Sequence, residues 1–339
     1  MGEESNNQSG KPNVSGAIPS IPAEAIAIGG VTVISGKKQR IDVPVAHLPT
    51  QTPISLPVTV INGTRPGPCL WVSAAIHGDE INGVEIIRQV LSQVKPRRLQ
   101  GTLIAVPIVN VFGFIEQSRY LPDRRDLNRS FPGSPRGSLA ARLANLFMRE
   151  IVAHCTHGID LHTASHHRIN LPQIRANLND PETYHVAKAF GAPLMIHAET
   201  RDGSLREAAA KRGIPILLYE AGEALRFDAD AIQTGVQGVL RVMSVLGMYP
   251  SKPLEHHDLG VKVDKTRWIR ASRSGILHIE IELGDRVIRR QRLGFISDAF
   301  GERSTTVHAP SNGIVIGHTR NPLVNQGDGI FHLAVLDSA

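Results

Sequence analysis

The segment CLWVSAAIHGDE, residues 69–80, decides the fold. Its first eight residues, 69–76, form a continuous apolar run, which is typical of a strand buried on both faces. The run ends at His77, and residues 82–94 follow with apolar side chains at helical spacing. We therefore expect a buried strand that passes through a short polar loop into a helix, which is the repeating unit of an α/β fold.

The same alternation continues along the chain. Further apolar runs predict buried strands, and amphipathic segments of ten to fifteen residues predict the helices between them. The expected strands are residues 102–110, 158–162, 193–196 and 214–220, and the expected helices are 138–152, 181–190, 205–212 and 228–246. Shorter runs over 31–60 read as edge strands. The fold class is α/β, with a mixed, largely parallel sheet flanked by helices.

Residues 251–339 differ in pattern. From Arg267 onward short apolar runs alternate with Gly-Asp and Pro-Ser-Asn-Gly turns, which predicts an appended, smaller all-β domain. Its rhythm resembles the barrel-sandwich of biotinyl and lipoyl domains, but Arg320 stands at the hairpin tip where those carry a lysine. We expect a cap over the site or a homo-oligomer contact. Residues 25–250 form the predicted catalytic domain, and 1–24 a disordered tail.

The composition argues against several classes of function. The chain has 339 residues and a formal charge of +6, but no dense basic run interleaved with aromatic residues, so we expect no nucleic-acid partner. No apolar run approaches the roughly 20 residues of a spanning helix, and the N-terminus lacks the order of a secretory signal. We therefore expect a cytoplasmic protein without a membrane partner. Two cysteines cannot form a thiolate metal site, so any metal must use histidine and carboxylate.

A candidate metal site begins at His77. His77 and Glu80 lie three residues apart directly after a predicted buried strand, where open α/β sheets bind ligands. His162 ends a second apolar strand and supplies a third ligand, although His166 and His167 compete for that place. Two histidines and one glutamate make a catalytic zinc set with one position open, so we expect one Zn²⁺ per chain.

Two further segments carry charged residues. Residues 119–133, RYLPDRRDLNRSFPG, place four arginines in one loop, and planar guanidinium groups pair well with carboxylates, which indicates an anionic ligand. Glu220 ends the predicted strand 214–220 and could accept a proton from activated water, with Glu223 as its rival. Asp126 and Asp160 either orient the ligand imidazoles or serve in turns and ion pairs.

The chain resembles the succinylglutamate desuccinylase/aspartoacylase family over about residues 55–250. The motifs that carry the resemblance occur in the order AAIHGDEINGVEII, SRYLPDRRDLNRSFPG, DLHTAS and LLYEAG. The resemblance implies a zinc-carboxypeptidase-like fold.

The resemblance also implies roles for individual residues. It makes His77, Glu80 and His162 the zinc ligands, Asn128 and Arg129 the holders of a substrate carboxylate, Arg119 the oxyanion group and Glu220 the general base. The arginine loop is two residues longer than in the family, so Arg124 or Arg125 could replace Arg119, and Arg125 is a further candidate for substrate binding.

These features favour a zinc-dependent amidohydrolase that removes the acyl group from a small anionic N-acyl amino acid. One alternative keeps the metal and acts as a carboxypeptidase on peptides or cell-wall peptides. Another is a non-catalytic protein that binds a metal or ligand.

Overall fold

The computed structural model describes residues 23–165, 167–250 and 260–336. A mixed sheet of 13 strands forms its centre. Four neighbouring strands in the middle are parallel, and the chain connections between them contain helices. In spatial order they are β6 (Gln100–Val106), β5 (Arg65–Ala74), β7 (His157–Ala164) and β10 (Ile216–Glu223).

Antiparallel strands extend this parallel centre on both sides. Beyond β6 lie β4 (Pro53–Asn62) and β3 (Lys38–His47), and beyond β10 lies β8 (Arg168–Ala176). β9 (Leu194–His197) pairs with β8 in parallel. A separate hairpin consists of β1 (Ile26–Ile28) and β2 (Val31–Val33).

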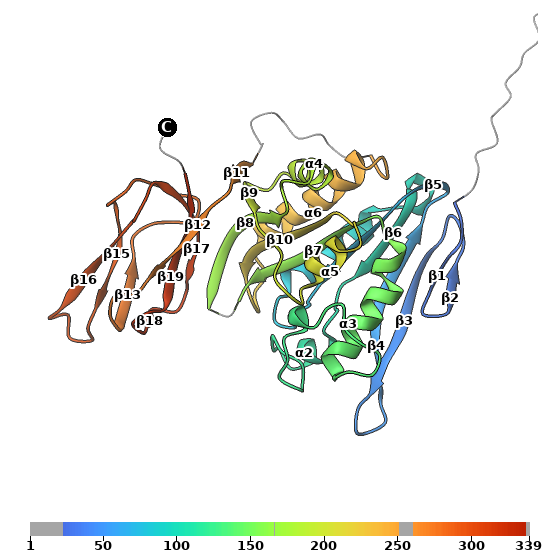
Figure 1. Ribbon diagram of the computed structural model, residues 1–339, viewed down its shortest axis with the longest axis horizontal. Helices are drawn as coiled ribbons and strands as arrows, with labels where there is room; N and C mark the ends of the chain where they lie inside the picture. The colour runs from blue at the N-terminus through green and yellow to red at the C-terminus, as the bar shows by residue number, and fades with distance from the viewer. Residues whose placement is uncertain (1–22, 166, 251–259, 337–339) are drawn as a thin grey trace, which may run out of the picture.

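Helices cover both faces of the sheet (Figure 1). One core lies under α1 (Asn82–Gln93), α4 (Pro181–Phe190) and α6 (Ala229–Val245). The opposite core lies under α2 (Val111–Ile115), α3 (Leu139–Glu150) and α5 (Leu205–Ala210). Within the described ranges, three 3₁₀ turns accompany these helices: η1 (Pro96–Arg98), η2 (Leu127–Arg129) and η3 (Val152–His154).

Polar side chains and buried aromatic rings fix these helices in place. Ser138, Asp180 and Asp228 accept backbone N–H bonds at the first turns of α3, α4 and α6, and each such cap stabilises its helix by about 1 kcal/mol. Phe147 and Phe190 are fully buried, one in each core, and each burial contributes about 1.5–3 kcal/mol. None of the helices in the described part of the chain is long and apolar enough to cross a bilayer.

The C-terminal region is all-β, as predicted. Its strands are β11 (Val261–Val263), β12 (Thr266–Arg270), β13 (Gly275–Ile279), β14 (Arg286–Val287), β15 (Arg292–Ser297), β16 (Ser304–His308), β17 (Gly313–Thr319), β18 (Leu323–Val324) and β19 (Gly329–Val335). β16, β15, β13 and β18 make a separate four-stranded sheet. This β region lies at the β8 end of the main sheet (Figure 1).

The main sheet continues into the β region. β17 pairs antiparallel with β8, with Gly317 opposite Asn170 and Thr319 opposite Arg168, and β11 pairs in parallel with β9. Both backbone ladders join the two parts directly. The C-terminal strands therefore stand in a fixed position beside β8, whose side chains help to line the site described below.

The structure confirms the predicted fold class and adds elements that were not predicted from the sequence, among them β1, α2, β8 and β11. β8 has no counterpart among the predicted strands. Pro172 interrupts the sequence pattern typical of a strand, and polar residues occupy part of both faces. The predicted boundary at residue 251 falls in 251–259, and most of the predicted tail falls in 1–22, both outside the described residues.

Candidate active site

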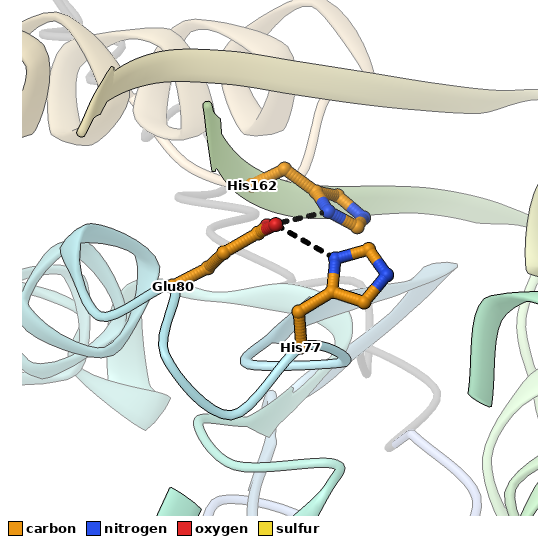
Figure 2. A group of neighbouring side chains, drawn as sticks. All are labelled: His77, Glu80 and His162. Atoms are coloured by element: carbon orange, nitrogen blue, oxygen red, sulfur yellow. Dashed lines mark hydrogen bonds and ion pairs between the residues drawn. The ribbon is translucent and has the colours of Figure 1, made fainter. Parts of the chain in front are cut away.

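Three side chains from two distant parts of the sequence meet at the carboxyl edge of the central strands. His77 Nδ1 lies 2.8 Å from Glu80 Oε1, and His162 Nδ1 lies 2.8 Å from Glu80 Oε2 (Figure 2). All three residues are buried, and one ligand atom from each lies within 4.8 Å of the others. The structure thus brings together the His77, Glu80 and His162 group that the sequence predicts.

The loop after β5 is shaped to present His77 and Glu80. Ala75 adopts a left-handed conformation with φ 50°, which turns the chain sharply at the strand end. Gly78 packs so closely on α2 that a Cβ atom would lie 2.0 Å from the Gly113 carbonyl carbon, so only glycine fits. The backbone N–H of Thr163, next to His162, donates to Glu80 Oε2 at 3.2 Å and ties the two strand ends together.

One aspartate contacts the far side of each imidazole ring. His77 Nε2 lies 3.2 Å from Asp126 Oδ1, and His162 Nε2 lies 2.8 Å from Asp160 Oδ2. Ser73 in turn donates to Asp160 Oδ1 at 2.8 Å. With Nε2 occupied by a carboxylate, Nδ1 of each ring faces Glu80, which is the orientation that a pair of metal-ligating histidines requires.

The electrostatics of this group favour an ionised Glu80. Burial acts to raise the pKa of Glu80, but His77 and His162 outweigh it and hold that pKa far below its usual value. Burial acts to lower the pKa of His162, but Asp160 and Glu80 raise it well above its usual range. Two imidazole nitrogens and one carboxylate in a buried cluster match the donor set of a catalytic zinc site, so the residues fit this ion.

Asp160 offers a test of this arrangement. Asp160→Asn should weaken zinc binding by about 10- to 100-fold, because the amide no longer supplies the charge that orients and polarises His162. Chelator competition would measure the affinity, with Asp230→Asn on the exposed surface of α6 as the matched control. Unchanged affinity in Asp160→Asn would show that the carboxylate does not support a metal ligand.

The arginine loop contributes some of its predicted residues to the site. Arg119 contacts Glu80 Oε1 at 3.2 Å and Asp126 Oδ2 at 3.0 Å, and Asn128 and Arg129 also line the cavity beside the histidines. Arg125 is exposed, pairs with Asp123 at 3.7 Å and is not among the lining residues. Arg124 is exposed as well, with φ 60°.

Glu220 and its rival lie in different surroundings. Glu220 is the register partner of His162 on the adjacent strand and lines the cavity. Its Oε2 accepts from Asn170 Nδ2 at 2.9 Å and lies 3.3 Å from Arg175 Nε. Glu223 pairs instead with Arg226 and Arg320, at 3.7 and 3.9 Å, and is not among the lining residues.

His167, one of the two histidines that competed for the third ligand position, does not join the group. His166 lies outside the described residues. His167 is exposed, has φ 60° and is not among the residues that line the cavity.

The cavity has a volume of about 670 Å³ and an excess of positive charge. Its charged lining comprises the glutamates Glu80, Glu199 and Glu220 and the arginines Arg119, Arg129, Arg168, Arg175, Arg201, Arg206 and Arg270. Burial, together with Arg175 and Arg201, lowers the pKa of Arg206 to about 10. An anionic ligand would relieve this crowding of like charges.

The C-terminal strands supply one wall of the cavity. Trp268 on β12 and His332 on β19 are stacked at 4.3 Å with an angle of 5° between their rings. The guanidinium of Arg168 on β8 lies 4.9 Å from the Trp268 ring, a cation–π contact. Burial, Arg175 and Arg168 lower the pKa of His332 to about 3, so its ring is neutral at pH 7.

The sequence reading missed several of these lining residues. Arg168, Asn170 and Arg175 lie on β8, and their polar spacing within an otherwise apolar segment was the available signal. Trp268 and His332 reach the cavity only because β12 and β19 join the main sheet through β17. No local pattern could have indicated that contact.

The mixed sheet and the His-Glu-His group at its carboxyl edge define a zinc-carboxypeptidase-like fold. Residues 66–246, more than half of the chain, match the model of the succinylglutamate desuccinylase/aspartoacylase catalytic domain. The chain belongs to this family.

Similar proteins agree with that assignment. The chain is 26% identical over 297 residues to the N-alpha-acetyl-L-2,4-diaminobutyric acid deacetylase of Halomonas elongata, covering 83% of this chain and 86% of the relative. The succinylglutamate desuccinylase/aspartoacylase of Rhodobacter sphaeroides superposes with a TM-score of 0.79 at 24% identity, over 89% and 96% of the two chains. The product-bound ectoine utilization protein EutE (DoeB) of Ruegeria pomeroyi gives 0.78 at 24% identity, over 88% and 95%.

Proposed function

We propose that this protein is a zinc-dependent deacylase that hydrolyses the amide bond of a small anionic N-acyl amino acid. The observation that carries the proposal is the buried group of His77, Glu80 and His162, which opens with Glu220 onto an arginine-lined cavity. Family membership supports the same chemistry. In this proposal one Zn²⁺ binds to the three side chains and supplies Lewis acidity toward water and the amide carbonyl.

Glu220 would act as the general base and then as the general acid. Asn170 and Arg175 hold its Oε2, so we assign proton transfer to Oε1. Glu220 accepts a proton from the attacking water and later delivers it to the nitrogen of the departing amine. Its backbone register beside His162 and its place in the lining of the same cavity support this role.

The arginines would bind charge at two points. Arg119 lies against Glu80 and offers N–H donors where negative charge develops on the amide oxygen. Asn128 and Arg129 would hold the α-carboxylate of the substrate. Asn128 is fixed for this role, because its Oδ1 accepts the backbone N–H of Leu205 at 3.0 Å.

The remaining lining charges favour a substrate with a second acidic group. Arg175 and Arg201 lie near Arg206, and burial together with their positive charges lowers the pKa of Arg206, although Glu220 acts to raise it. A carboxylate on the side chain or acyl group would be attracted there, whereas a cationic side chain would be repelled. We therefore propose that this chain acts on more acidic substrates than the 2,4-diaminobutyric acid derivative for which its Halomonas relative is named.

A panel assay tests the proposed function. Zinc-loaded protein should hydrolyse N-acetyl and N-succinyl derivatives of aspartate and glutamate with a kcat/KM at least about tenfold above that for N-α-acetyl-2,4-diaminobutyrate, since one favourable charge contact is worth about 1.4 kcal/mol or more. Dipeptides serve as the comparison for the carboxypeptidase alternative. Faster turnover of dipeptides would favour that alternative, and no turnover of any amide by zinc-loaded protein would favour the binding protein.

A further inference from the structure

Cys69 and Cys155 lie together although 86 positions separate them in the sequence. Their Sγ atoms are 3.2 Å apart. Cys69 lies in β5, and Cys155 directly follows η3 just before β7, the parallel neighbour of β5. Thr156 fixes the approach, because its N–H donates to Cys69 O at 2.8 Å and its Oγ1 accepts from Cys69 N at 3.2 Å.

We propose that Cys69 and Cys155 are a redox-active pair that a hydroperoxide oxidises reversibly to an intramolecular disulfide. A disulfide has an S–S distance of about 2.05 Å, so the sulfurs must close by only about 1.2 Å. The chain contains no other cysteine, so no third thiol competes for either partner. The proposal does not depend on the proposed deacylase function.

The surroundings of the two sulfurs differ and assign them different roles. Cys69 is partly exposed, whereas Cys155 is buried against the core under α3. Burial raises the pKa of the Cys155 thiol well above its usual value, and both the contact with the Cys69 sulfur and the charge on Cys69 act in the same direction. Cys69 is therefore the sulfur that meets the oxidant, and Cys155 is the resolving thiol.

The oxidation balances with hydrogen peroxide as the oxidant. The Cys69 thiolate attacks one peroxide oxygen and the O–O bond breaks. Cys69 becomes a sulfenic acid, and the departing hydroxide takes up a proton and leaves as water. The Cys155 sulfur then attacks the Cys69 sulfur, the S–O bond breaks and a second water leaves with the proton of Cys155. Two thiols and one peroxide give one disulfide and two waters.

The disulfide would connect the two strands that carry the metal-ligand group. β5 leads to His77 and Glu80, and β7 carries His162 near its carboxyl end, whereas Cys69 lies midway along β5 and Cys155 lies two residues before β7 begins. From Cys69 to Ala74 the strand extends about 17 Å at about 3.3 Å per residue. Oxidation should therefore stabilise the fold and leave the site unchanged.

Intact mass and thermal unfolding of the full-length protein test the proposal. After brief treatment with hydrogen peroxide, the monomer should lose about 2 Da and both titratable thiols, and dithiothreitol should restore them. The midpoint of thermal unfolding should rise by roughly 5 °C on oxidation, because the bond closes a long loop in the unfolded chain. Cys69→Ser and Cys155→Ser are the matched controls, and neither should show this rise.

Three results would overturn the proposal. These are a monomer that keeps both thiols after peroxide treatment, a gain of about 32 Da that marks a sulfinic acid, and a disulfide-linked dimer in place of the lighter monomer. All three are read from the wild-type chain, so they hold even where a serine variant folds poorly.

Discussion

Replacing His162 with alanine should lower kcat/KM for amide hydrolysis by about 10³-fold or more and release the bound zinc. The buried group offers one ligand atom each from His77, Glu80 and His162, so the variant keeps only two. The Lewis acidity of the ion is worth several kcal/mol in the transition state, and each 1.36 kcal/mol is a factor of ten in rate. Metal content per chain and steady-state kinetics would be measured on the same preparation.

A matched control and a second measurement separate the loss of zinc from a general loss of folding. His185→Ala, on the exposed side of α4, should leave metal content and turnover unchanged. Because His162 is buried between Asp160 and Glu80, its loss could also weaken the fold. The wild-type protein should therefore also be stripped with a chelator and reloaded, and its activity should disappear and return with zinc. Full turnover by stripped protein would refute the zinc mechanism.

The group of His77, Glu80 and His162 was predictable because its signal is local. His77 and Glu80 directly follow an apolar run, and His162 ends another, so the placement of each residue could be read from its own few neighbours. The carboxyl ends of adjacent parallel strands then bring the two segments together without further information. β5 and β7 pair directly in the structure.

The rest of the cavity was not predictable, because it depends on contacts between distant segments. From the sequence, Arg119 was the expected oxyanion arginine, with Arg124 or Arg125 as possible replacements in the same loop, and only the path of that loop separates them. Arg119 turns inward to Glu80. The wall formed by Trp268 and His332 depends on the pairing of β17 with β8, which no pattern within either strand encodes.

Glu220→Gln should lower kcat by about 10²- to 10⁴-fold with little change in KM and no loss of zinc. Glutamine has nearly the shape of glutamate and can still accept the hydrogen bond from Asn170, but it cannot take up a proton from water. Positioned proton transfer contributes a factor of this size, and it acts on the transition state rather than on substrate binding. Steady-state kinetics on the best substrate of the panel would separate the effects on kcat and KM.

Glu223→Gln is the control that makes this test sharp, because it is the same substitution three residues further along β10. Glu223 pairs with Arg226 and Arg320 at 3.7 and 3.9 Å, distances at which a partly exposed ion pair is worth about 0–1 kcal/mol. We therefore expect Glu223→Gln to keep kcat within about fivefold of the wild type. The opposite pattern, with Glu223→Gln inactive and Glu220→Gln active, would transfer the general-base role to Glu223, and two active variants would require a different proton acceptor in the cavity.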